Sequence, residues 1–239
     1  KEGKLRARLS ELSGGRKFRV DSPASRSEMT GGNVFFDVGG SGTTRVANHG
    51  GPPVEVSGKG GASDESVTVP EGMGTKVQKG RPPSPPEQLP SAPEWRSTSN
   101  VISIGGEPVE ISAAWEPVGE AAEYFVEFAA DRSGIEILKS VYVPAKVTNQ
   151  EVEKALPGTY YATVSTIDDD GFEGIPSERA ELHVWSVEHD EAARLDREGP
   201  PTFVVGTRLS APKGMRCAVE SGEPTPSVRL GTPGRRMLR

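Results

Sequence analysis

Cysteine is almost absent from the sequence: Cys217 is the only one in 239 residues, so no disulfide bond can form within the chain. No histidine lies near it, and we expect a small buried side chain instead of a reactive thiol. Long apolar runs are also absent, since none approaches the ~20 residues that a transmembrane helix needs. The chain begins with charged residues at Lys1, unlike a signal peptide, and stops abruptly after Arg239. We therefore expect a processed or partial piece of a longer protein.

Aromatic residues make up only 6% of the chain and hydrophobic residues 33%, whereas glycine and proline are abundant, with 29 and 21 copies. Glycine and proline at this frequency interrupt long helices and favour short strands joined by turns. The low apolar fraction predicts small cores and a large share of loops. These features predict an all-β protein of two or three lightly built domains.

The formal net charge of −6 argues against nucleic acid as the main partner, because phosphate binding needs clustered Lys and Arg. The charge is uneven, however. Basic residues gather at both ends of the chain, and the stretch from Glu116 to Glu198 is mostly acidic. Ordinary solubilising charge is the simplest explanation. The alternative is that acidic middles and basic ends dock on each other, between copies of the chain or with a partner.

Residues 1–79 predict a first β domain. Apolar and polar residues alternate from Lys4 to Leu12, as in a half-buried strand. The run from Val34 to Val38 alternates in the same way and leads into Gly39-Gly40-Ser41-Gly42, which predicts a hairpin. Residues 80–93 contain six prolines, and such a run forms an extended, semi-rigid spacer. A ligand for a proline-recognition domain is the alternative interpretation of this segment.

Residues 94–187 predict a second domain, because about seven short strands separated by turns fit an immunoglobulin-like sandwich. In the remaining part, residues 188–239, the stretch from Glu188 to Glu198 has helix propensity. A β pattern then returns in residues 203–209, 215–219 and 227–230. We expect a short helix followed either by a partial β domain or by an extension of the sandwich.

Three motifs in residues 94–187 carry a family resemblance. They are a strand that ends in Trp115, the run Tyr124-Phe125-Val126, and the turn Leu156-Pro157-Gly158-Thr159-Tyr160 followed by Ala162 and Val164. Together they resemble a fibronectin type III domain, which implies that the tryptophan fills the core and that a tyrosine after the turn bonds back to the chain. The turn is one residue shorter than usual, so Tyr160 and Tyr161 are alternatives for that corner, and alternation favours Tyr160. The expected core residues are Trp115, Tyr124, Val126, Leu156, Tyr160 and Val164.

The first predicted domain carries a second resemblance. Its motifs are Phe18 to Ala24, a strand ending in Phe36-Asp37-Val38, Val54 to Ser57, and Val67 to Thr75 ahead of the prolines. This order resembles a FecR domain, an extracytoplasmic β-rich module of bacterial envelope proteins. The resemblance implies a periplasmic or otherwise extracytoplasmic location, in association with the outer membrane. The best-known members relay a receptor's state to a sigma factor, but this sequence has no transmembrane helix or cytosolic segment, so that role does not follow.

No group of reactive side chains points to catalysis. The three histidines, His49, His183 and His189, lie in different segments without metal-binding spacing. We therefore predict no enzyme and no cofactor. The best metal candidates are Asp168, Asp169 and Asp170, because calcium sites use several carboxylates. Glu173 is too close to complete an EF-hand, and Asp-rich turns form readily without an ion, so a plain turn is the default interpretation.

Three candidate functions are compatible with these observations. The leading one is a non-catalytic scaffold of the bacterial cell envelope, whose partners are other envelope proteins or copies of itself. Strand edges and the aromatic residues Phe125, Tyr161 and Trp95 are the candidate contacts. The second function is a FecR-type sensory relay. The third is binding of peptidoglycan or another glycan on exposed aromatic platforms, which ranks last because aromatic residues are few.

Overall fold

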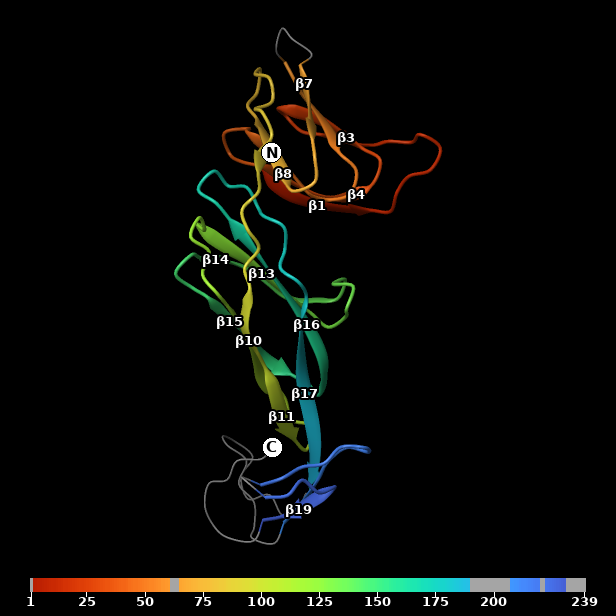
Figure 1. Cartoon of the computed structure of the whole chain (residues 1–239), viewed down its shortest axis with the longest axis vertical. Coiled ribbons are helices and arrows are strands. Elements are labelled where there is room, and N and C mark those ends of the chain that lie inside the picture. Colours follow the sequence, from red (N-terminus) through yellow and green to blue (C-terminus); the bar gives the residue numbers. More distant parts are fainter. Residues whose placement is uncertain (1, 61–64, 190–206, 220–221, 231–239) are drawn as a thin grey trace.

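The computed structural model describes residues 2–60, 65–189, 207–219 and 222–230, and every regular element within these ranges is a β-strand. The all-β prediction is therefore confirmed. In this described part of the chain, no helix is long and apolar enough to cross a membrane. Two β domains and a short C-terminal ribbon follow one another along the long axis of the molecule (Figure 1).

Two antiparallel sheets make up the first domain. One has the order β1-β4-β5-β8-β9 and consists of β1 (Gly3–Leu9), β4 (Gly32–Val38), β5 (Thr44–Gly50), β8 (Met73–Val77) and β9 (Glu87–Gln88). The other has the order β2-β3-β6-β7 and consists of β2 (Phe18–Asp21), β3 (Ser25–Met29), β6 (Val54–Gly58) and β7 (Ser66–Val69). A core built mostly of valine, with Met29 and Phe36 as its largest members, lies between them.

The side chains of strand β4 alternate between the core of the first domain and the contact with the second domain. Val34 and Phe36 point into the core of the first domain, because alternate residues of a strand face the same side. Phe35, between them, is buried on the opposite face of the sheet. A phenylalanine there needs another cover, and the second domain supplies it.

The proline-rich segment 80–93 packs along the first domain instead of standing free. Ser84 N donates to Lys76 O over 2.9 Å, and Leu89 N donates to Gly72 O over 2.9 Å. Within the segment, Glu87 and Gln88 form β9 against β8. These bonds fix the direction in which the chain enters the second domain.

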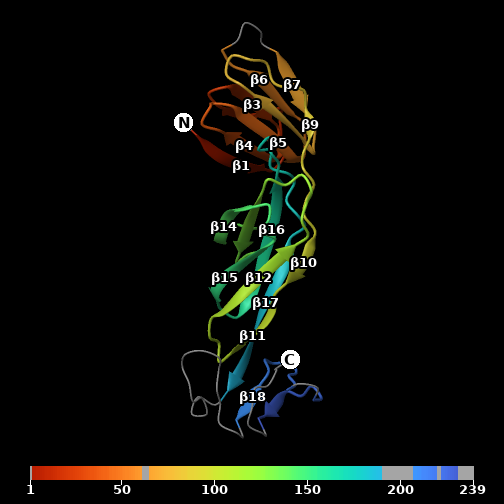
Figure 2. The same ribbon diagram turned by 90° about the vertical axis from the view of Figure 1, so that its left-hand side faces the viewer.

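The second domain is a sandwich of a three-stranded sheet and four strands of a seven-stranded sheet. The first has the order β10-β12-β15, with β10 (Trp95–Thr98), β12 (Val109–Trp115) and β15 (Asn149–Ala155). The second has the order β14-β13-β16-β17, with β13 (Glu123–Ala129), β14 (Ile137–Pro144), β16 (Gly158–Ile167) and β17 (Ala180–His189). The short strand β11 (Asn100–Ile104) runs parallel to β17. Figure 2 shows both sheets of this domain below the first domain.

The core of the second domain has the features of a fibronectin type III-like fold. Trp115, Tyr124, Val126 and Val164 are fully buried in it, with Trp115 edge-on to Tyr124 at 5.4 Å between ring centroids. Tyr160 packs against this core.

The tyrosine corner lies at the start of β16. Tyr160 Oη donates to Leu156 O over 2.7 Å, which is the bond that defines such a corner. Leu156 differs from the prediction, because its side chain is exposed and only its carbonyl oxygen serves the corner.

Strand β17 continues beyond the sandwich and joins the C-terminal ribbon of β18 (Arg208–Ser210) and β19 (Ser227–Arg229). Of the helix predicted over 188–198, Glu188 and His189 belong to the end of β17, and the remainder lies outside the described residues. The strand predicted over 203–209 is described only from Thr207 onward.

Candidate functional site

The contact between the two domains is built on one rung of the five-stranded sheet. Arg6 of β1 lies opposite Phe35 of β4, Phe35 lies opposite Ala47 of β5, and Ala47 lies opposite Gly74 of β8. All four residues lie on the sheet face that is turned away from the first domain's core, because residues in one rung share a face. The first two side chains are large and the last two are small, so the face forms a socket over Ala47 and Gly74.

Phe172 of the second domain fills this socket. Its side chain is 1% exposed and packs with Phe35, Ala47 and Leu89. At Gly74 the ring lies directly on the backbone: a β-carbon there would be only 2.8 Å from two ring carbons of Phe172. Gly74 therefore has a steric role, since any larger residue would push the two domains apart.

A tight turn presents Phe172 to the socket. Asp168 Oδ1 accepts a hydrogen bond from Phe172 N at 2.8 Å, and Gly171 N donates to Asp168 O at 3.0 Å. Gly171 has a φ of 81°, which glycine adopts without strain. Two of the three aspartates proposed as calcium ligands thus have other contacts. Asp168 shapes the turn, Asp169 is exposed, and Asp170 bonds to Lys76 of the first domain at 2.7 Å.

Beside Phe172, a buried ion pair joins the domains. Arg6 Nη2 lies 2.6 Å from Glu173 Oε2, and the Glu173 side chain is 1% exposed. The guanidinium also lies over two rings, 4.0 Å from the centroid of Phe125 and 4.8 Å from that of Phe35. Cation–π contacts strengthen when water is excluded. One arginine therefore contacts a carboxylate and two aromatic rings within the same contact.

His49 completes the contact from strand β5. Its Nε2 lies 2.7 Å from Glu173 O, and because a carbonyl oxygen only accepts, the histidine donates. The imidazole stacks on Phe35 with 6.1 Å between ring centroids. Burial lowers the pKa of His49, and the positive charges of Arg6 and Arg8 lower it further, against the opposing effect of Glu173. The neutral form of His49 is therefore the one that the closed contact favours.

The carboxylate of Glu173 is only half satisfied. Its Oε1 is buried and has no hydrogen-bond partner among the described residues. An uncompensated buried oxygen is costly, so the Arg6 contact matters more to this carboxylate than a surface ion pair would. Any change that removes Arg6 leaves a buried charge behind.

Further contacts surround this centre, which we call the domain junction: Arg6, Phe35, Ala47, His49, Gly74, Leu89, Phe125, Phe172 and Glu173. Lys4 Nζ lies 3.7 Å from the ring centroid of Tyr142, and Arg45 Nε donates to Asp170 O. The basic side chains Lys4 and Arg6, which alternate along β1, thus face the second domain. Two ion pairs, Arg6–Glu173 and Lys76–Asp170, join basic side chains of the first domain to acidic side chains of the second.

The three predicted contact aromatics occupy different places. Phe125 is buried under Arg6, so it serves the domain junction and offers no free surface. Trp95 is half-buried, and its Nε1 donates to Glu178 O over 2.7 Å. Tyr161 is half-buried opposite Glu181 on the outer face of the sheet that contains β16 and β17.

Sequence reasoning missed Arg6, His49, Phe172 and Glu173 as a group, because they are up to 167 residues apart. Two signals were present. Basic residues alternate along β1, and Phe172 is an apolar residue immediately after a polar turn. Neither signal names its partner, which only the arrangement of the domains provides.

The other histidines do not form a site with metal-ligand character. His183 stacks on the exposed Trp185 with 5.0 Å between centroids, and its Nδ1 lies 3.2 Å from Thr159 Oγ1. Across the described ranges, no group of three or more His, Cys, Asp or Glu side chains is placed to hold a metal ion. Cys217 is buried, as expected for a packed side chain.

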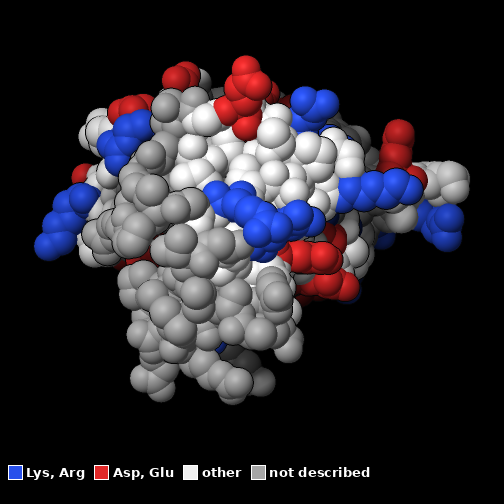
Figure 3. Space-filling model, turned by 90° about the horizontal axis from the view of Figure 1, so that it is seen from below, with Lys and Arg blue, Asp and Glu red and all other residues white. Residues whose placement is uncertain are grey.

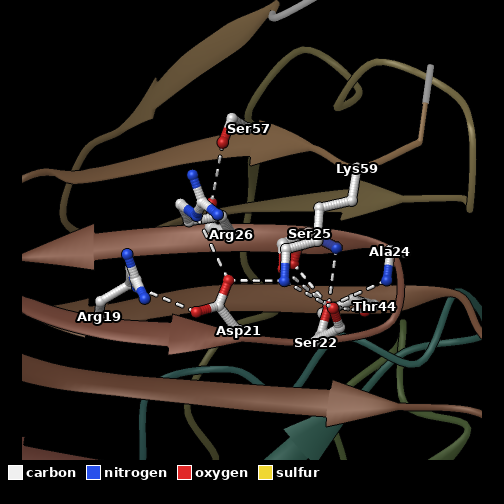
Figure 4. A network of polar contacts seen from close by, with 9 residues as sticks. All are labelled: Arg19, Asp21, Ser22, Ala24, Ser25, Arg26, Thr44, Ser57 and Lys59. Atoms are coloured by element: carbon white, nitrogen blue, oxygen red, sulfur yellow. Dashed lines mark hydrogen bonds and ion pairs between the residues drawn. The ribbon is translucent and has the colours of Figure 1, made fainter.

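A second polar cluster shapes the turn between β2 and β3 (Figure 4). Asp21 receives three cationic side chains, from Arg19, Arg26 and Lys59. Next to it, Ser22 Oγ accepts from Ser25 N at 2.8 Å and contacts Thr44 Oγ1 at 2.8 Å. Hydrogen bonding to Lys59 lowers the pKa of Asp21 in spite of the opposing effect of desolvation. These bonds hold the turn in place.

The C-terminal ribbon is basic. Arg208 and Arg229 lie directly opposite each other on β18 and β19, and Lys213 and Arg216 are exposed nearby. Seen from this end, Lys and Arg side chains lie close to Asp and Glu side chains (Figure 3). The described part of this surface is therefore mixed in charge, as ordinary solubilising residues would make it.

Comparison with known proteins identifies no family. No protein-family model matches the chain, and no curated protein matches it. The FecR resemblance therefore stays a prediction from sequence.

Solved structures are similar at low identity. The FN1–FN3 domains of chicken CNTN1 are 14% identical, with 96% of this chain and 88% of that chain covered and a TM-score of 0.34. A β-1,2-glucanase from Parabacteroides distasonis is 10% identical, with coverage of 76% and 35% and a TM-score of 0.32. The extracellular domain of the putative one component system BT4673 from B. thetaiotaomicron is 8% identical, with coverage of 76% and 31% and a TM-score of 0.30. The chain spans about a third of the length of these two bacterial proteins, and similarity at this level carries no functional argument.

Proposed function

We propose that this chain is a non-catalytic scaffold whose two β domains act as one stiff unit, exposed outside the cytoplasm as part of a bacterial envelope assembly. The observation that carries the proposal is the domain junction. Phe172 in its socket and the Arg6–Glu173 pair give the two domains a fixed relative position. A stiff spacer needs a dry, well-packed contact of this kind, since loosely joined domains move relative to each other.

Two further features support a scaffold. The proline-rich segment is bonded to the first domain, so the covalent link between domains is itself ordered. Strand β17 runs from the sandwich into the C-terminal ribbon, which extends the same unit at its other end. The location outside the cytoplasm rests on the sequence resemblance to envelope modules, and it is tested by fractionating cells that produce the full-length protein.

Stiffness is tested by small-angle X-ray scattering of the full chain and of a Phe172→Ala variant. A scaffold predicts a scattering profile of the wild type that a single elongated conformation reproduces. Phe172→Ala should broaden the distribution of interdomain distances, because it empties the socket. Ile175→Ala, a nearby change of an exposed side chain, is the control and should leave the profile unchanged. A wild type as broadly distributed as Phe172→Ala would refute the proposal.

A further inference from the structure

Arg8 of β1 differs from the other basic residues on the outer face of the five-stranded sheet. It alternates with Lys4 and Arg6 along the strand, so all three side chains point to the side of the second domain. Arg6, Arg45 and Lys76 each pair with a carboxylate, and Lys4 lies over an aromatic ring. Across the described ranges, no ion pair involves Arg8. The first domain therefore presents an unpaired guanidinium beside the domain junction.

Arg8 meets a second arginine, from the other domain, at Gly134. This glycine lies in the turn between β13 and β14, where the lack of a side chain leaves a small space. A β-carbon at Gly134 would lie 3.1 Å from Arg179 Nη2 and 3.7 Å from Arg8 Nη1. Both arginine side chains are exposed, and within the described part of the chain no carboxylate pairs with Arg179 either. Two unpaired positive charges thus border the same space.

The turn holds Arg179 in this position. Arg179 Nη1 donates to Arg132 O, which leaves Nη2 directed at the space beside Gly134. Gly134 has a φ of 72°, and its N donates to Asp131 O over 3.1 Å. The Asp131 carboxylate accepts from Ile135 N over 2.9 Å. Asp131 therefore stabilises the turn itself instead of pairing with the arginines.

The two guanidiniums suit a doubly charged oxyanion. Like charges close together repel each other, and an anion between them removes that repulsion. A guanidinium presents its N–H groups in a planar fork that matches the oxygens of a phosphate or sulfate group. Charge-assisted bonds of this kind are about 2.7–2.9 Å long, so an oxygen beside Gly134 needs only small movements of the two flexible side chains. A single carboxylate would balance only one of the two charges.

From this arrangement we infer that Arg8 and Arg179 form an anion site beside Gly134, which binds a phosphate or sulfate group, either as the free ion or as part of a larger molecule. Because Arg8 belongs to the first domain and Arg179 to the second, the bound anion links the two domains, next to the ion pairs of the domain junction. The inference goes beyond the scaffold proposal by assigning a ligand, and the site depends on the same relative position of the two domains.

Isothermal titration calorimetry of the full chain with inorganic phosphate tests the site at low ionic strength, where charges are weakly screened. We expect a dissociation constant of about 1 mM for the wild type, and binding that is roughly tenfold weaker for Arg8→Gln and for Arg179→Gln. Both side chains are exposed, so these variants should fold like the wild type. Arg216→Gln removes an exposed arginine from the C-terminal ribbon and is the matched control, which should bind phosphate as the wild type does.

Filling the space separates a defined site from general attraction of anions. Gly134→Asn keeps both arginines and adds a neutral side chain, because asparagine tolerates a positive φ, and it should also weaken phosphate binding roughly tenfold. The same titration with glycerol 3-phosphate distinguishes the sources of the group. Tighter binding than that of inorganic phosphate would indicate a group carried on a larger molecule, and equal or weaker binding would indicate the free ion.

A wild type that binds no phosphate at about 50 mM would overturn the inference, as would equal weakening by Arg216→Gln and Arg8→Gln. Scattering of the wild type without phosphate tests the scaffold proposal separately. A stiff chain that binds no phosphate would therefore refute the anion site and leave the scaffold proposal standing.

Discussion

Arg6 and Glu173 are 167 residues apart in sequence, yet their charged atoms lie 2.6 Å apart at the centre of the domain junction. Each comes from a different domain, and the pair joins them. Its environment is asymmetric, because Glu173 is almost fully buried whereas Arg6 keeps a 26% exposed side chain. Loss of the arginine is therefore expected to cost more than loss of a surface ion pair.

Replacing Arg6 by methionine should destabilise the second domain although Arg6 belongs to the first. The change keeps an apolar stem and leaves Glu173 buried without its cation, for an expected loss of roughly 2–4 kcal/mol in the free energy of unfolding. All three tryptophans, Trp95, Trp115 and Trp185, lie in the second domain, so urea unfolding followed by tryptophan fluorescence reports the effect. Lys17→Met, which breaks an exposed pair with Glu28, is the control and should leave the transition unchanged. Equal transitions for Arg6→Met and wild type would show that the pair does not couple the domains.

Replacing Gly74 by alanine should wedge the socket open. The added β-carbon would lie 2.8 Å from the Phe172 ring, and overpacking of this kind costs about 1–3 kcal/mol. The same fluorescence-detected unfolding measures it. Gly119→Ala is the matched control, because a β-carbon at Gly119 meets nothing within 4 Å. Combining Gly74→Ala with Phe172→Leu should recover part of the loss, and a purely additive double variant would contradict the steric explanation.

Tyr160→Phe should destabilise the second domain by about 1 kcal/mol, since it removes the hydrogen bond from Tyr160 Oη to Leu156 O. Tyr161→Phe removes a hydroxyl from the next residue, on the opposite face of the same strand, and should be close to neutral. Thermal unfolding of the two variants distinguishes the corner tyrosine directly. A larger loss of stability in Tyr161→Phe than in Tyr160→Phe would show that Tyr160 is not the corner tyrosine.

The domain junction should weaken as the solution becomes acidic. Burial holds the pKa of His49 below its ordinary value of 6.5, so the unfolded chain binds the proton more readily than the closed junction. The stability contributed by neutral His49 is therefore complete above about pH 6.5 and is lost as the pH falls towards the lowered pKa. The charges that face the imidazole are Arg6 and Arg8 of β1 and Glu173 of the second domain.

Unfolding midpoints measured between pH 8 and pH 5 test whether stability falls as the pH falls. His49→Gln retains a donor for Glu173 O but does not titrate, so the drop below pH 6.5 should be smaller in this variant than in the wild type. An identical pH profile for both proteins would remove His49 as the cause.

The sequence alone was sufficient for the fold class and for much of the second domain. Trp115, Tyr124 and Val164 are buried because their spacing with period two fixes which side of a strand they face, and this local rule needs no knowledge of distant residues. The tyrosine corner is similarly local, spanning four residues. Leu156 was misassigned because a turn motif specifies the backbone bond, not the direction of that side chain.

The domain junction was decided by tertiary structure. Nothing local distinguishes the solvated Lys17 from Arg6, or a loop phenylalanine from Phe172, until the second domain lies on the outer face of the five-stranded sheet. Phe125 illustrates the same limit, since its alternation predicts an outward side chain but not that the first domain covers it. The two-residue alternation of strands and the residue preferences of turns act over a few residues, so they can be recognised in the sequence. The shape complementarity between Gly74 and Phe172 exists only after the two domains meet.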